Sequence, residues 1–170
     1  IKIPEYETTM TKLAAIQKLH QAVNGYLYMS DEDGNRKTYH IERNKKLDWL
    51  RSNMPKTPTV IVYRFDEDKQ QLSTELTIAG CTYTEIIEEF KKGKVNILLL
   101  QCSRCESFNL QMCKHMIFYT LDYSYIKYNQ MIHRIWRMGQ TENVQIDVLT
   151  FKDTIETKIW NTVRNKEKLA

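Results

Sequence analysis

Hydrophobic residues follow two different spacings along the chain, and the change falls near Pro58. Before it, apolar residues recur at helical spacing over 8–24 and again over 44–53. Between these two segments, runs rich in Tyr, Met and Thr flank the acidic turn 31–34, which predicts a small hairpin. We therefore expect residues 1–56 to form a helical and hairpin lead-in packed on the domain that follows.

After Pro58, short β-branched or aliphatic runs alternate with segments of helical spacing. The runs that we expect to form strands are 59–65, 95–100, 116–120 and 144–150. Such alternation is typical of βαβ crossovers in a parallel sheet. Strands that are apolar at every position fit a sheet covered on both faces. The fold class predicted for residues 57–170 is therefore a three-layer α/β/α arrangement around a parallel sheet.

Composition and charge agree with a soluble globular domain. The chain has 170 residues, of which 42% are hydrophobic and 27% charged, enough for a core of its own. Its longest aliphatic run, 97–100, is far too short to cross a bilayer, so no membrane is expected. A net charge of +4 permits a nucleic-acid partner without requiring one.

The first residue and the composition of the chain indicate the kind of protein and genome that it comes from. It starts at Ile1 rather than Met, without a signal-peptide pattern, so we expect a piece of a larger cytoplasmic protein. Few Gly and Pro, with many Lys, Asn, Ile and Tyr, suggest an AT-rich genome of a bacterium or a phage.

Common phosphate-binding loops are excluded. The five glycines are never five residues apart, so the chain has no G-x-x-x-x-G-K-[ST] loop. The patterns G-x-G-x-x-G and G-x-S-x-G are absent too. If the protein uses a nucleotide, another part of a larger chain must bind its phosphates.

The segment 130–140, Gln-Met-Ile-His-Arg-Ile-Trp-Arg-Met-Gly-Gln, carries the strongest candidate chemistry. A continuous helix would place Gln130, Arg134 and Arg137 on one face, opposite an apolar stripe, and would end at Gly139. Two guanidiniums one turn apart are costly to hold together unless an anion lies between them, and phosphate is the natural candidate. By spacing alone, an ordinary amphipathic helix with a solvated basic face is the alternative.

The pattern Q-x-x-x-R-x-x-R-x-G-Q resembles the sixth motif of Swi/Snf-type helicase-like ATPases of superfamily two. Weaker similarities occur in the family's order. Thr57–Phe65 resembles the strand of the fourth motif, Leu98–Leu110 the fifth motif, and Asp153–Ile159 the family's Thr-Ile-Glu helix start. The resemblance covers roughly residues 45–169. It implies the second, C-terminal RecA-like lobe of a DNA-dependent ATPase that acts as a helicase or translocase.

The resemblance also implies a role for each matching residue. Arg137 would be the arginine finger on the γ-phosphate of ATP, Arg134 its partner, and Gln130 would help to shape the cleft between the lobes. The nucleotide cleft would also include His133, Gly139, Gln140 and Asn109. ATP and Mg²⁺ would be held mainly by the first RecA-like lobe of the same parent chain, so this chain alone should be inactive.

DNA is the second partner that the resemblance implies, bound through its backbone and without sequence specificity. The expected contact residues are Arg64, Ser103, Arg104 and Ser107. Ser107 stands where the family usually has glycine, which puts close approach of the backbone to a phosphate in doubt. Arg104 could supply a side-chain contact instead, or could simply be solvated. The alternative function is therefore a non-catalytic nucleic-acid or protein-binding module derived from such a lobe.

Three cysteines and a histidine have a spacing that could either bind zinc or place small apolar side chains in the core. Cys102, Cys105, Cys113 and His115 spell C-x-x-C-x₇-C-x-H, which resembles the spacing of zinc ligands. However, the first follows a predicted strand and the last two border the next, so we expect burial as small apolar residues and predict no metal site.

Overall fold

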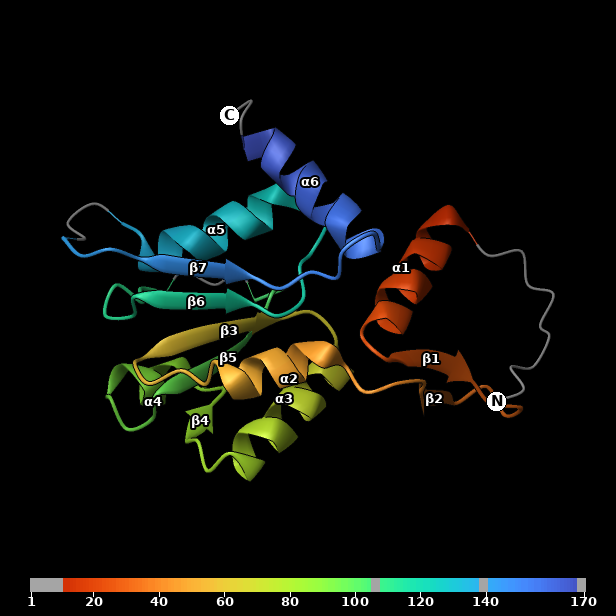
Figure 1. The fold of residues 1–170 in the computed structure, drawn as a ribbon, viewed down its shortest axis with the longest axis horizontal. Helices are drawn as coiled ribbons and strands as arrows, with labels where there is room; N and C mark the ends of the chain where they lie inside the picture. The colour runs from red at the N-terminus through yellow and green to blue at the C-terminus, as the bar shows by residue number, and fades with distance from the viewer. Residues whose placement is uncertain (1–10, 105–107, 138–140, 168–170) are drawn as a thin grey trace. The chain divides into compact units, whose positions relative to one another are not determined.

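A computed structural model of the chain describes residues 11–104, 108–137 and 141–167 (Figure 1). The chain divides into two compact units, the first ending at Arg43 and the second beginning at Asn44.

The division falls earlier than the boundary expected after residue 56. The reason is helix α2 (Lys45–Ser52), which the sequence assigns to the lead-in. Its side chains Leu47 and Leu50 are buried in a hydrophobic core of the second unit. The helix is therefore a part of the larger domain.

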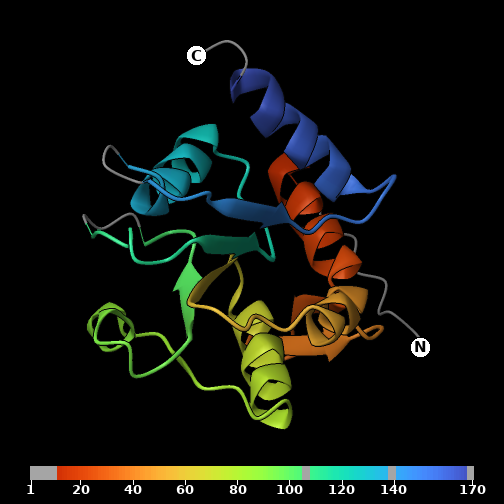
Figure 2. The same ribbon diagram turned by 60° about the vertical axis from the view of Figure 1, so that its left-hand side comes forward.

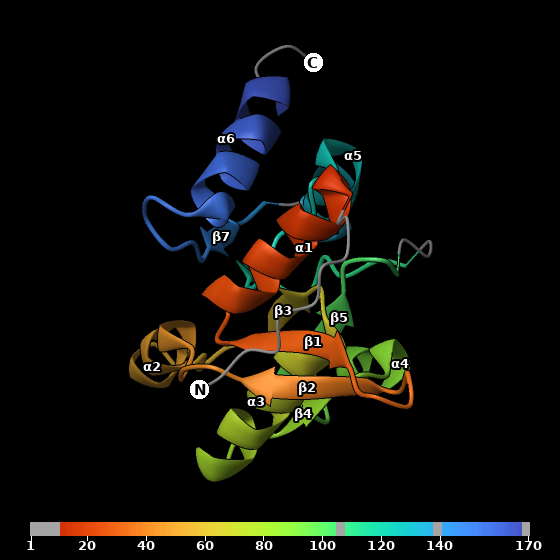
Figure 3. The ribbon, with the colours of Figure 1, turned by 90° about the vertical axis from the view of Figure 1, so that its right-hand side faces the viewer.

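The first unit contains a helix and a hairpin (Figure 3). Its elements are α1 (Lys12–Val23), β1 (Tyr26–Ser30) and β2 (Arg36–His40). In the turn between the strands, the Asp31 carboxylate accepts hydrogen bonds from the backbone N–H groups of Asp33 (3.1 Å) and Asn35 (2.8 Å). The strands pair antiparallel, so the predicted helix and hairpin are both present.

The second unit is built on a five-stranded parallel sheet with the order β4-β5-β3-β6-β7. Its strands are β3 (Thr59–Tyr63), β4 (Tyr83–Thr84), β5 (Ile97–Gln101), β6 (His115–Phe118) and β7 (Gln145–Val148). Four of them are the predicted strands. The sequence does not predict β4, because two residues are too few to show any periodicity.

Helices cover both faces of this sheet (Figures 1 and 2). Besides α2 they are α3 (Asp66–Ile78), α4 (Ile87–Lys91), α5 (Tyr125–Ile135) and α6 (Ile155–Glu167). Side chains of α2 and α3 form one hydrophobic core with one face of the strands, and side chains of α4, α5 and α6 form a second core with the other. The predicted three-layer α/β/α fold is confirmed.

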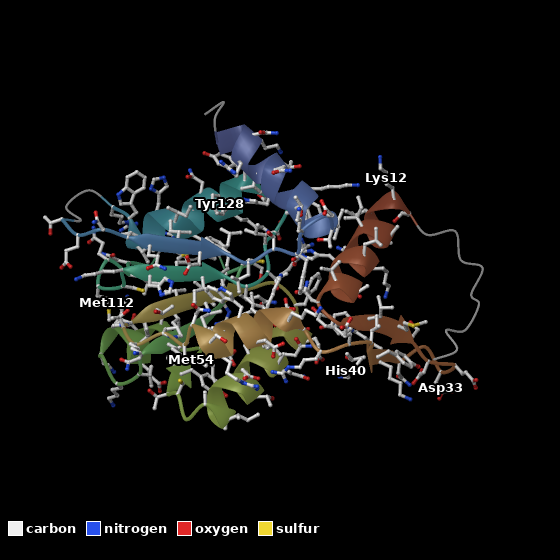
Figure 4. The ribbon with its side chains drawn as sticks, in the orientation of Figure 1. Lys12, Asp33, His40, Met54, Met112 and Tyr128 are labelled. Carbon is white, nitrogen blue, oxygen red and sulfur yellow. The ribbon has the colours of Figure 1, made fainter. Side chains whose placement is uncertain are left out.

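Aromatic contacts fix α5 over the sheet. The ring of Tyr128, labelled in Figure 4, lies 5.0 Å from that of Phe118 in β6 and 5.6 Å from that of Trp160 in α6. Tyr128 is buried, and such pairs stabilise by about 0.5–1.5 kcal/mol beyond the area that they bury. These contacts place the helix that carries Arg134 and leads to Arg137.

Candidate nucleotide and nucleic-acid sites

Because all strands of the sheet are parallel, it has a carboxyl edge, where the strands end, and an amino edge, where they begin. Tyr63 lies beside Gln101 at the carboxyl edge, and Thr59 lies beside both Ile97 and His115 at the amino edge. Arg64, Ser103 and Arg104, which follow β3 and β5 in sequence, therefore belong to the carboxyl edge.

Helix α5 leads from the carboxyl edge back to the amino edge. It starts after β6 has ended, and the segment after it leads to the start of β7 (Figure 1). The predicted nucleotide residues Arg134 and Arg137, at its C-terminal end, therefore lie toward the amino edge. The sheet thus separates them from the predicted DNA contacts.

Helix α5 ends at Ile135, earlier than predicted. Trp136 has an extended backbone (φ −102°, ψ 95°), and Arg137 follows it outside the helix. The prediction that Arg134 and Arg137 share one helix face is therefore wrong. The Arg134 carbonyl accepts a hydrogen bond from the Leu110 N–H (2.9 Å), so a distant segment replaces the donor that a further helical turn would supply. The predicted end at Gly139, and Gln140, lie outside the described residues.

Arg134 is half-buried against the predicted fifth motif. Its guanidinium lies 5.2 Å from the centroid of the Phe108 ring, which is close enough for a cation–π contact. Asn109, between Phe108 and Leu110, is exposed, and its amide forms a local turn with Gln111. The Leu110–Arg134 hydrogen bond thus brings the segment of Asn109 close to Arg134.

The remaining described residues of the predicted nucleotide cleft are exposed. They are Gln130, His133 and Arg137. Within the described parts of the chain, Arg137 forms no ion pair. An exposed guanidinium without an ion pair in the described residues can bind an anion that another domain or a ligand supplies.

At the carboxyl edge, Arg64 faces inward. Its side chain is 15% exposed, and Nη1 lies 3.9 Å from Oδ2 of Asp122. The guanidinium also lies 5.1 Å from the centroid of Phe65 and 5.4 Å from that of Tyr123. The side chain of Arg64 is therefore occupied by contacts within the protein. Its contact with DNA stays a prediction, because little of the side chain is exposed.

Two other predicted DNA contacts, Ser103 and Arg104, are exposed in the turn after β5. The Arg104 N–H donates to the carbonyl of Gln101 (3.0 Å), which fixes the turn and leaves the side chain at the surface. Ser107 lies outside the described residues. Among the predicted DNA contacts, Arg104 is thus the accessible cation at the carboxyl edge.

Asp122 forms a charged cluster that the sequence does not predict. Its carboxylate accepts hydrogen bonds from Lys127 Nζ (3.1 Å) and the Ser124 N–H (3.0 Å), and Arg64 lies nearby. Burial alone would raise the pKa of Asp122, but the hydrogen bond from Lys127 and the charge of Arg64 hold it below its usual value. The carboxylate therefore stays ionised and orients both cations.

A buried ion pair joins α2 to the start of α6, and the sequence gives no signal for it. Lys46 Nζ lies 2.5 Å from Oε1 of Glu156 and donates to the Tyr119 carbonyl (2.8 Å). The two charged side chains are only 4% and 3% exposed. Burial lowers the pKa of Lys46, and the Glu156 charge opposes that change. The partners are far apart in sequence, so spacing cannot reveal them.

The described residues of the possible zinc motif lie at opposite edges of the sheet. Cys102 follows β5 at the carboxyl edge, whereas Cys113 and His115 lie at the amino edge. His115 Nε2 is 2.8 Å from Asp147 Oδ2, and its Nδ1 is 3.2 Å from Thr59 Oγ1. Both ring nitrogens thus have partners within the sheet. Cys105 is outside the described residues, and in the described ones no group of three potential ligands could hold a metal ion.

Stability at alkaline pH should report on burial at the carboxyl edge. Burial raises the pKa of Cys102 from its ordinary 9.0, and those of Tyr63 and Tyr123 from 10.0, to about 12 each. The fold therefore favours the neutral forms of these three groups. Their contribution to the free energy of unfolding is complete below the pKa values of the unfolded chain and is lost as pH rises toward the folded values. We expect the free energy of unfolding in urea to fall from about pH 9 to about pH 12. Cys102→Ala should make this fall shallower, and an unchanged profile would contradict the assignment.

The comparisons with known proteins agree with this architecture. The helicase conserved C-terminal domain family matches residues 46–139, more than half of the chain and inclusive of both candidate arginines. The chain therefore belongs to this family. Its parallel sheet with helices on both faces is the RecA-like fold of such a C-terminal lobe.

The chain is also similar to a solved structure and to a curated protein. The fold is similar to the crystal structure of the C-terminal part of the Fun30 ATPase domain, with a TM-score of 0.64 and 22% identity, covering 71% of this chain and 45% of that one. The sequence is 34% identical over 80 residues to the uncharacterized ATP-dependent helicase YqhH of Bacillus subtilis (strain 168). That alignment covers 47% of this chain and 14% of the relative, so the chain spans a small part of it.

Within the described residues, none of the helices is long and apolar enough to cross a membrane.

Proposed function

We propose that this chain is the second motor lobe of a Swi/Snf-type, DNA-dependent ATPase that works as a helicase or translocase. ATP would bind between this lobe and a first RecA-like lobe of the same parent protein. The observation that carries the proposal is Arg137, which leaves α5 with an exposed side chain at the amino edge of a sheet of this family.

The proposed chemistry divides the work between the lobes. The first lobe would hold the phosphates and Mg²⁺, since this sequence has no phosphate-binding loop. Closure of the lobes would bring Arg137 and Arg134 to the γ-phosphate. Charge develops on the equatorial oxygens during phosphoryl transfer, and a guanidinium in a water-excluded cleft stabilises that charge.

A single segment supports coupling between DNA and ATP. Arg104 follows β5 at the carboxyl edge, and Leu110, six residues later in the sequence, donates a hydrogen bond to the Arg134 carbonyl at the end of α5. A DNA phosphate bound at Arg104 would therefore lie only six residues in sequence from the contact that holds the Arg134 carbonyl. Contacts of this kind read the backbone, so binding should be non-specific and weaken with salt.

The Arg104→Ala change in the intact protein tests the DNA edge. We expect weaker DNA binding and a loss of about one from the slope of log K against log salt, because one phosphate contact disappears. ATP turnover at saturating DNA should change little. Arg164→Ala, which removes an exposed arginine of α6, is the matched control and should leave the salt slope unchanged. Equal slopes for wild type and Arg104→Ala would exclude this residue from the interface.

The activity itself is tested by measuring ATP hydrolysis of the intact parent protein with and without DNA. Stimulation by DNA supports the motor. Retention of DNA binding without any turnover would instead favour the binding module, in which the altered fifth motif no longer serves hydrolysis.

A further inference from the structure

The C-terminal end of α5 is held by two stacked rings. The imidazole of His133 and the indole of Trp136 lie 5.9 Å apart between centroids, with only 8° between their planes. His133 Nδ1 is also 3.3 Å from the carbonyl oxygen of Trp136. A carbonyl can only accept, so Nδ1 carries the proton of this hydrogen bond. Trp136 is 58% exposed, so burial in the core does not explain the pair.

These contacts fix the backbone directly before Arg137. The Trp136 carbonyl and the Arg137 nitrogen belong to one planar peptide group. A hydrogen bond to that carbonyl therefore sets the orientation of the whole plane. At the other end of the same residue, the Trp136 N–H donates to the carbonyl of Ile132 (2.9 Å). Trp136 is thus held on both sides in an extended conformation that turns Arg137 out of the helix.

Arg134 is positioned by a different set of contacts. Its backbone carbonyl is bound by Leu110, and its guanidinium lies over Phe108. Neither contact involves the His133–Trp136 pair. The two arginines therefore have separate supports, and disturbing the ring pair should displace Arg137 without releasing Arg134.

We propose that His133 and Trp136 are positioning residues for Arg137: the imidazole holds the Trp136–Arg137 peptide plane, and the indole holds the imidazole. This inference rests on the proposed function, in which Arg137 approaches the γ-phosphate. It gives His133 a role through the backbone in place of a direct contact with the nucleotide.

Two matched pairs of variants in the intact two-lobe protein test this role. His133→Asn keeps an N–H donor, whereas His133→Asp has nearly the same shape and cannot donate to a carbonyl. Trp136→Phe keeps an aromatic ring, whereas Trp136→Leu removes it. We expect His133→Asp and Trp136→Leu to lower kcat by about 10²-fold, as a misplaced catalytic group does, with little change in KM for ATP. The Asn and Phe variants should retain most of kcat. Ile126→Ala, at an exposed residue of the first turn of α5, is the control.

The outcomes separate this inference from the function on which it rests. Active wild type with equal kcat values within each pair would overturn the positioning role and leave the motor intact. A parallel rise of KM in both His133 variants would indicate direct contact with the nucleotide and would also overturn it. Wild type without DNA-stimulated turnover would refute the proposed function and this role together. In NMR spectra, the Arg137 amide should shift in His133→Asp and stay near its wild-type position in His133→Asn.

Discussion

Replacing Arg137 with alanine in the intact two-lobe protein is expected to lower ATP turnover by about 10³–10⁵-fold, the range measured for arginine fingers. The reason is the position of the side chain. It is exposed beyond the end of α5 and forms no ion pair within the described residues, so its charge is available to a phosphate on another lobe. DNA binding should be nearly unchanged, because the predicted DNA contacts follow the opposite edge of the sheet.

Three further variants sharpen this prediction. Arg137→Lys keeps the charge and loses the planar pair of donors, so it should recover only a part of the activity. Arg134→Ala should lower turnover and also loosen the packing on Phe108, because that guanidinium lies over the ring. Arg164→Ala is the control for loss of an arginine elsewhere. If Arg137→Ala turns over ATP within a few-fold of wild type, this arginine is not the finger.

The Lys46→Ala change is expected to have the largest effect on stability. It would leave Glu156 charged in a site where the side chain is only 3% exposed, and breaking a buried pair in this way costs about 3–5 kcal/mol. The start of α6 should suffer most, because Glu156 also accepts a hydrogen bond from the Phe151 N–H (3.1 Å). Urea denaturation of the chain, followed by circular dichroism, measures the loss.

A double variant separates the unpaired charge from the lost packing. Lys46→Met combined with Glu156→Leu removes both charges and keeps most of the volume, so it should cost much less than the two single changes added together. The Lys91→Ala change, at a residue that pairs with Glu88 on the surface of α4, should cost at most about 1 kcal/mol. If the losses in the free energy of unfolding from the two single changes add up to that of the double variant, the interaction between Lys46 and Glu156 contributes nothing to stability.

The fold could be predicted from the sequence because its strands are buried on both faces. β3 and β5 are apolar at nearly every position, and no amphipathic helix has that pattern. The sixth motif was also visible, since its arginines, glutamine and glycine lie within eleven residues of sequence. Local patterns thus identified both the sheet and the main candidate site.

What could not be predicted depends on contacts between distant segments. Helical spacing continues through Arg137, yet the helix ends at Ile135, where Leu110 binds the Arg134 carbonyl and His133 binds the Trp136 carbonyl. The Lys46–Glu156 pair is invisible for the same reason. The sequence predicts Arg64 as a DNA contact and gives no sign that Asp122 and two aromatic rings lie around its side chain.

In the proposed function, one lobe separates an arginine that faces ATP from an arginine that faces DNA. The most direct measurement follows DNA binding and ATP turnover together for intact wild type, Arg137→Ala and Arg104→Ala. We predict DNA-stimulated turnover by wild type, loss of turnover with retained binding in Arg137→Ala, and weakened binding with near-normal turnover at saturating DNA in Arg104→Ala. Turnover in Arg137→Ala equal to wild type, or no turnover in wild type, would contradict this prediction.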